Sequence, residues 1–150
     1  MRDGFVKVAV ATPEVRVADS VYNAERTLAM IRQAAEQDVK LLLLPELGLT
    51  GYTCGDLFLQ RTLLEGTEEA LGRLLDETAD LETVWVVGLP VRVRGELYNC
   101  AAVCQQGTIL GVVPKTHIPN YSEFYEKRHF AAAPAENLKI SLCGQEPTFG

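Results

Sequence analysis

The chain has 150 residues, 47% of them hydrophobic and 23% charged, which is the composition of one soluble globular domain. Its net charge is −6 and its 14 lysines and arginines are scattered, which excludes the clustered positive charge of a nucleic-acid-binding surface. No apolar run is long enough to span a bilayer, so we expect no membrane partner. The N-terminus lacks a secretory signal pattern, and we therefore expect a cytoplasmic protein.

The first half of the chain predicts a strand, a helix and a second strand. Residues 6–11 alternate weakly and predict a strand, and apolar residues then recur at helical spacing up to residue 37. Asp19 or Ser20 can cap this helix. Residues 40–44 predict a second strand, and this order indicates a right-handed parallel crossover. A second amphipathic helix is predicted from about residue 57 to residue 78.

The pattern changes after residue 83, where β-rich runs are separated by short turns at residues 94–95 and 105–107. These turns predict antiparallel hairpins, so we expect an α/β fold with a mixed sheet. Cys100, Ala102 and Cys104 share a parity on the middle run and are interpreted as small core residues that face the same way. Residues 114–134 predict a long functional loop, and residues 138–142 predict another strand.

Two charged side chains follow an apolar run and a proline. Glu46 comes after four leucines and Pro45, and Lys115 comes after two valines and Pro114. Crevices in open α/β folds form at the carboxyl ends of strands, so these opposite charges could share one crevice. Each also has a simpler interpretation, because Glu46 could be a solvated glutamate in a glycine-rich loop and Lys115 an exposed lysine.

Three segments resemble the nitrilase, or carbon-nitrogen hydrolase, superfamily. PELGLTGYTCGDLF (45–58) and PKTHIPNYSEFYEKRHF (114–130) resemble more narrowly the glutaminase half of glutamine-dependent NAD synthetase, and ISLCGQEPTFG (140–150) extends the match. The resemblance implies a four-layer α/β/β/α sandwich with mixed sheets. Residues 1–150 would form the N-terminal part of the glutaminase domain, incomplete at the C-terminal end, and we expect the synthetase domain to be absent from this chain.

The resemblance also implies roles for individual residues. Glu46 would be the general base, Lys115 the cation that stabilises the oxyanion, and Glu126 the second glutamate beside the lysine. This chemistry is coherent because a cysteine thiol is mostly protonated at neutral pH and needs a carboxylate to accept its proton. Tyr121 and Phe124 would line a glutamine pocket, with ordinary packing of a long loop as the alternative interpretation.

We do not expect the family's nucleophilic cysteine in this chain. Cys54 and Cys143 are the candidates, but each resembles a family position other than the nucleophile. The four cysteines show no CxxC or zinc-type spacing, so no metal site is expected either. The isolated chain is therefore expected to be inactive.

A complete relative would hydrolyse glutamine here and pass the ammonia to the amidation of deamido-NAD. ATP and Mg²⁺ would be cofactors of the absent synthetase domain, and this part would need none. The implied partners are glutamine, deamido-NAD, ATP and further copies of the chain in a homo-oligomer. Two alternatives remain: a truncated amidase or nitrilase of another branch, and a non-catalytic remnant that binds a partner through its unfinished sheet.

Overall fold

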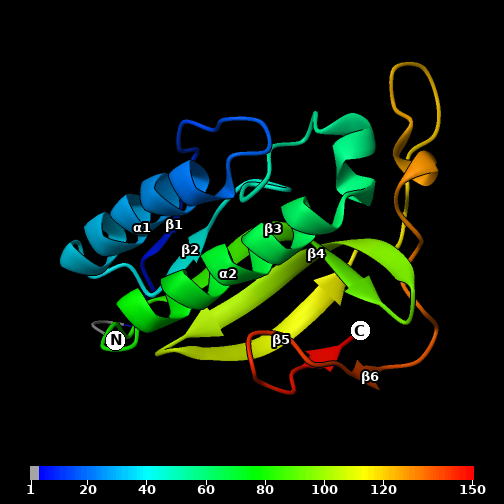
Figure 1. The fold of residues 1–150 in the computed structure, drawn as a ribbon. Coiled ribbons are helices and arrows are strands. Elements are labelled where there is room, and N and C mark those ends of the chain that lie inside the picture. Colours follow the sequence, from blue (N-terminus) through cyan, green and yellow to red (C-terminus); the bar gives the residue numbers. More distant parts are fainter. Residues whose placement is uncertain (1–3) are drawn as a thin grey trace.

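The structure is a computed structural model and describes residues 4–150. Its strands are β1 (Val8–Val10), β2 (Leu41–Leu43), β3 (Val84–Val93), β4 (Glu96–Gln105), β5 (Thr108–Pro114), β6 (Leu138–Lys139) and β7 (Thr148–Phe149). They form one sheet in the order β1-β2-β3-β4-β5-β7-β6 (Figure 1). β1, β2 and β3 are parallel to one another, whereas β4 pairs antiparallel with both β3 and β5. The predicted mixed sheet is therefore confirmed.

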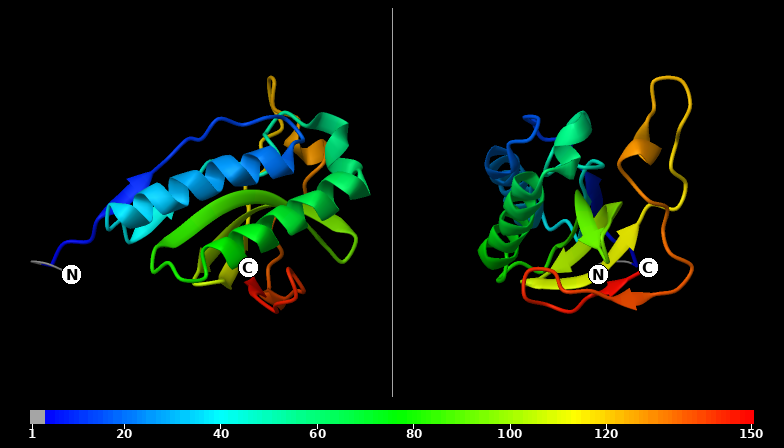
Figure 2. Two further views of the ribbon diagram at one scale, coloured as in Figure 1. Left: turned by 60° about the vertical axis from the view of Figure 1, so that its left-hand side comes forward. Right: turned by 45° about the vertical axis from the view of Figure 1, so that its right-hand side comes forward.

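Helices α1 (Ser20–Glu36) and α2 (Arg61–Glu77) lie on the same side of the sheet (Figure 2). They connect β1 to β2 and β2 to β3, and two crossovers of one hand that move the same way across a sheet cover the same face. As expected, Asp19 caps α1, its side chain accepting a hydrogen bond from the Tyr22 amide. The predicted helix over residues 57–78 is wrong in one respect. A 3₁₀ helix, η1 (Gly55–Leu59), is separated from α2 by Gln60, whose backbone is extended.

The main core lies between the two helices and the sheet. Trp85 of β3 is fully buried, and its indole nitrogen donates to the Thr78 hydroxyl at the end of α2, at 3.2 Å. Cys100, Ala102 and Cys104 of β4 are buried in the same core cluster, as their shared parity predicts. Burial raises the pKa of both thiols far above the usual range, so these two cysteines are packing groups.

The opposite face of the sheet carries large apolar side chains that the described residues leave exposed. They are Val8, Val10, Leu41, Leu43 and Val113. They alternate along β1, β2 and β5 with residues that point to the helices, because successive side chains of a strand face opposite ways. Residues 4–150 thus form one sheet covered by helices on one face, which is two of the four layers that the resemblance implies.

The last third of the chain follows the edge of the sheet. The segment after β5 projects beyond the strands before it returns (Figure 1), and it contains the 3₁₀ helix η2 (Glu126–Arg128). The strand predicted over residues 138–142 is shorter, since β6 contains only two residues. The sequence did not predict β7, which pairs parallel with β5 and antiparallel with β6. Within residues 4–150, no helix combines the length and the apolar character needed to cross a membrane.

Candidate active site

Strand direction brings Glu46 and Lys115 to the same edge of the sheet. β2 is parallel to β3, and β5 is related to β3 by two antiparallel pairings, so β2 and β5 run the same way. Both residues follow the carboxyl end of their strand. The Lys115 ammonium nitrogen lies 2.7 Å from Oε1 of Glu46, although the two residues are 69 positions apart in sequence. The structure thus brings together the charges that the sequence places at two strand ends.

Glu46 reaches Lys115 because the turn after β2 lies across β3. β2 and β5 are three strand spacings apart, about 14 Å, which side chains alone would not bridge. Gly88 of β3 makes room for the turn, since a Cβ atom there would lie 2.6 Å from the Pro45 carbonyl oxygen. Its own carbonyl accepts a hydrogen bond from the Leu49 amide at 3.2 Å. An isolated glycine inside a strand pattern is the sequence signal for such a close backbone approach.

Glu126 completes a cluster in which one lysine lies between two carboxylates. Its side chain is only 6% exposed, and the Lys115 ammonium donates to both of its oxygens at 3.0 Å. The Tyr52 hydroxyl donates to Oε1 of Glu126 at 2.7 Å. Burial and the neighbouring Glu126 carboxylate raise the pKa of Tyr52, so the hydroxyl keeps its proton and remains a donor.

The ammonium group of Lys115 is charged at neutral pH. Partial burial lowers its pKa, but the hydrogen bonds and negative charges of Glu46 and Glu126 outweigh burial and leave the pKa above its ordinary value. A fixed positive charge between two carboxylates suits a group that stabilises a developing oxyanion.

Asn99 of β4 belongs to the same cluster, although it was not among the residues predicted from the sequence. Its side chain is 3% exposed, and Nδ2 donates to Oε1 of Glu46 at 2.5 Å. The sequence does contain a signal for this residue, since Asn99 is a polar residue flanked by apolar ones on β4. A polar side chain buried at such a position requires a hydrogen-bond partner.

A clamp holds the segment of Tyr52 against the segment of Glu126. The Asp56 carboxylate of η1 accepts two hydrogen bonds from the Arg128 guanidinium, at 2.8 and 2.9 Å, and lies 3.0 Å from Nε2 of His129. The hydrogen bonds from Arg128 and His129 hold the pKa of Asp56 well below its usual range. We call these three residues the Asp56 clamp.

The aromatic residues expected to bind glutamine lie on the projecting segment. The Tyr121 and Phe124 rings pack edge to face, with centroids 5.7 Å apart, and Tyr121 is 68% exposed. A cavity of about 220 Å³ beside Glu126 is lined by Tyr125 and not by these two rings. Their role in substrate binding stays a prediction.

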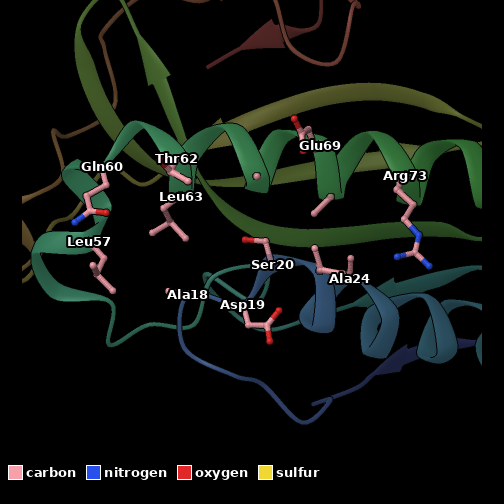
Figure 3. A pocket seen from close by; sticks show the side chains of 13 residues that line it. Ala18, Asp19, Ser20, Ala24, Leu57, Gln60, Thr62, Leu63, Glu69 and Arg73 are labelled. Carbon is pink, nitrogen blue, oxygen red and sulfur yellow. The ribbon is translucent and has the colours of Figure 1, made fainter.

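A cavity of about 520 Å³ is a groove between α1 and α2 (Figure 3). Two of its polar side chains have partners elsewhere, because Asp19 caps α1 and Arg73 lies 3.5 Å from Glu25. None of the predicted catalytic residues lines it.

The two cysteines weighed as nucleophiles have other partners. The Cys54 thiol is buried and donates to two backbone oxygens of the preceding turn, at 3.1 and 3.4 Å. Cys143 lies against Glu68 of α2, and burial raises its pKa to about 11. Both thiols are therefore mostly protonated at neutral pH. Within the described part of the chain, no group of three or more His, Cys, Asp or Glu side chains is arranged to hold a metal ion.

Comparison with known proteins identifies the family of this chain. The sequence matches the family Carbon-nitrogen hydrolase over residues 7–148, and the chain belongs to this family.

Individual relatives show which members of the family this chain resembles. The glutamine-dependent NAD(+) synthetase of Mycobacterium tuberculosis is 43% identical over 147 residues, which are 98% of this chain and 22% of that protein. The crystal structure of a glutamine-dependent NAD(+) synthetase from Cytophaga hutchinsonii has a TM-score of 0.87 and 30% identity, over 94% of this chain and 24% of that chain. An amidase from Nesterenkonia sp. shares the fold, with a TM-score of 0.74 at 20% identity over 99% of this chain and 56% of its own. The chain thus spans less than a quarter of the length of these two synthetases, and the resemblance to their family is confirmed.

Proposed function

We propose that this chain supplies the general base, the lysine and the second glutamate of the glutamine amidohydrolase site of a glutamine-dependent NAD synthetase. The observation that carries the proposal is the Lys115 ammonium, 2.7 Å from Glu46 and 3.0 Å from the buried Glu126. The 30% identity to the synthetase structure, against 20% to the amidase structure, favours this branch over a free-standing amidase.

In the proposed reaction, Glu46 accepts the proton of a cysteine thiol, and the thiolate attacks the side-chain amide carbon of glutamine. The electron pair of the carbonyl bond moves to its oxygen, and the Lys115 ammonium stabilises the resulting oxyanion. Glu46 then returns the proton to the leaving nitrogen, the carbon–nitrogen bond breaks, and ammonia leaves a thioester. Water attacks the thioester after losing a proton to Glu46, the carbon–sulfur bond breaks, and Glu46 returns the proton to the thiolate. Glutamate and the thiol are released.

The remaining components of the proposal would be supplied by other segments than these 150 residues. The thiol would come from a further segment, because Cys54 and Cys143 have other partners. Amidation of deamido-NAD, with ATP and Mg²⁺, would take place in a synthetase domain, and this part would need no cofactor. We further propose a homo-oligomer in the cytoplasm, where the four free cysteines would remain reduced.

A chimera tests the proposal. This chain would replace the matching 147-residue segment of the Mycobacterium tuberculosis synthetase, and NAD formation would be measured with glutamine and, separately, with ammonium chloride. We expect the chimera to use both nitrogen sources. Glu46→Gln should lower glutamine-dependent NAD formation on the order of 100-fold or more and leave ammonium-dependent formation unchanged, because only the hydrolytic step needs the base.

The matched control is Glu136→Gln, which removes the charge of an exposed glutamate and should change neither activity. A chimera that forms NAD from ammonium but never from glutamine would contradict the proposed function.

A further inference from the structure

We propose that Asn99 is a positioning residue that holds Glu46 so that one carboxylate oxygen stays free to accept a proton. This inference rests on the proposed function, since it concerns the base of the same site. Asn99 contacts Glu46 through its side chain and Lys115 through its backbone.

The hydrogen bonds on Glu46 are distributed unequally between its two oxygens. Oε1 accepts from Asn99 at 2.5 Å and from the Lys115 ammonium at 2.7 Å. Oε2 receives no hydrogen bond from any residue in the range 4–150. Two donors that converge on one oxygen fix the rotation of the carboxylate. The other oxygen keeps its lone pairs for the reaction.

Lys115 alone cannot hold this arrangement throughout the reaction. Its ammonium has three N–H donors, and they serve Glu46 and both oxygens of Glu126. When an oxyanion forms on the substrate, at least one donor must turn toward it. Glu126 is buried and also held by Tyr52, whereas the Glu46 side chain is 45% exposed, so the bond to Glu46 is the easier one to release. Asn99 then remains as the donor that keeps Glu46 in position.

The backbone around Asn99 is rigid enough for this role. Asn99 lies inside β4, which is paired on both sides by β3 and β5. Its carbonyl oxygen accepts a hydrogen bond from the Lys115 amide at 2.8 Å. One residue of a central strand therefore sets both the side chain of the base and the backbone of the lysine. A site built on a strand in this way is held more precisely than a site built on loops.

The first test measures the contact in the 150-residue chain by NMR. Replacing Glu46 by alanine should shift the side-chain amide resonance of Asn99 and speed the exchange of its protons with solvent. Asn23 is the internal control, because its side-chain nitrogen donates to the carbonyl oxygens of Arg16 and Leu49 and should not respond. An Asn99 resonance that is unchanged in Glu46→Ala would overturn the inference, whatever the chimera does.

The second test measures catalysis in the chimera. Asn99→Leu keeps the branched outline and the number of heavy atoms and removes the donor, and Asn99→Asp keeps the shape and replaces the donor by an oxygen. Each should lower kcat for glutamine hydrolysis roughly 10- to 100-fold with little change in KM, because the base is misplaced while substrate binding remains. Ammonium-dependent NAD formation should not change. Melting temperatures of the variants separate this effect from a loss of folding. If Asn99→Leu does not fold, Asn99→Asp still tests the loss of the donor.

A rise in KM at unchanged kcat in both variants would overturn the inference. A chimera with the unaltered chain that hydrolyses no glutamine would instead overturn the proposed function, and the NMR test would still decide whether Asn99 holds Glu46.

Discussion

A Cβ atom on Gly88 would lie 2.6 Å from the carbonyl oxygen of Pro45, inside the 3.0 Å within which real Cβ atoms are essentially never found. The turn that carries Glu46 therefore rests directly on the backbone of β3. This close approach lets a glutamate that follows β2 reach an asparagine of β4 and a lysine that follows β5. The geometry of the site thus depends on a residue that contributes no side chain.

Replacing Gly88 by alanine should destabilise the chain by about 2 kcal/mol, because the added carbon must push the turn off the strand. Glutamine-dependent activity of the chimera should be lost with it. Gly111→Ala is the matched control, since a Cβ atom at that position of β5 would be 3.8 Å from its nearest neighbour. Urea unfolding measures both variants, and equal stabilities would show that the turn can shift without cost.

Replacing Lys115 by methionine should lower the free energy of unfolding by about 3 kcal/mol, because it leaves the Glu126 carboxylate buried without a counter-charge. Adding Glu126→Gln should recover part of this loss by removing the buried charge. The exposed pair of Arg61 and Glu65 is the control, and its disruption should cost less than about 0.5 kcal/mol. A double variant no more stable than Lys115→Met would contradict the prediction.

The Asp56 clamp predicts a specific loss of stability in acid. The folded chain holds the pKa of Asp56 below its ordinary value of 3.8, so the clamp stabilises the fold fully above that value and is lost as the pH falls below it. The stability difference between the wild type and Asp56→Asn should therefore be constant near neutral pH and shrink below pH 3.8. Urea unfolding at a series of pH values measures it.

Alkylation of the cysteines should be slow at neutral pH. The pKa of Cys143 is about 11, so its thiolate fraction, and the rate of its reaction with iodoacetamide, should rise about tenfold per pH unit up to that value. Cys100 and Cys104 should stay unlabelled in the folded chain because they are buried. Mass spectrometry of the labelled peptides measures this order. Rapid labelling of Cys54 or Cys143 at pH 7 would identify an activated thiol and reopen the choice of nucleophile.

The apolar face of the sheet opposite the helices predicts self-association of the isolated chain. Exposed valines and leucines on three strands form the kind of patch that drives association. Leu43→Lys with Val113→Lys should shift the chain toward monomer in size-exclusion chromatography with light scattering. Val21→Lys, at an exposed valine of α1, should leave the association unchanged. A monodisperse monomer before any substitution would show that this face is tolerated in water.

Apolar spacing was sufficient to predict most of the fold. The two helical stretches, the parallel strands and the two hairpins follow from the different burial periods of helices and strands. The break at Gln60 was not predictable in this way, because the apolar period continues through it. β7 was not predicted because a strand of two residues is too short to show an alternation of apolar and polar side chains. Its pairing with β5 is a long-range contact.

The site was predictable only where strand geometry determined it. The meeting of Glu46 and Lys115 follows from strand ends, whereas the place of Glu126 came from the family resemblance alone. Asp56 of η1 and Arg128 of η2 meet across 72 residues of sequence, and neither periodicity nor turn chemistry indicates such a contact. The sequence could have predicted that Asn99 is a buried polar residue, but it could not have predicted that Glu46 is its hydrogen-bond partner.

β3 belongs at once to the parallel half of the sheet, with β1 and β2, and to the antiparallel half, with β4 and β5. Glu46 belongs to the first half and Lys115 to the second. The ion pair between them therefore cannot form while either half is still unfolded, and it should be among the last contacts made as the chain folds. Contacts between such distant residues slow folding, since the intervening chain must first lose its entropy. Hydrogen exchange of the Lys115 amide during folding, compared with that of amides in α1, would measure when the site forms.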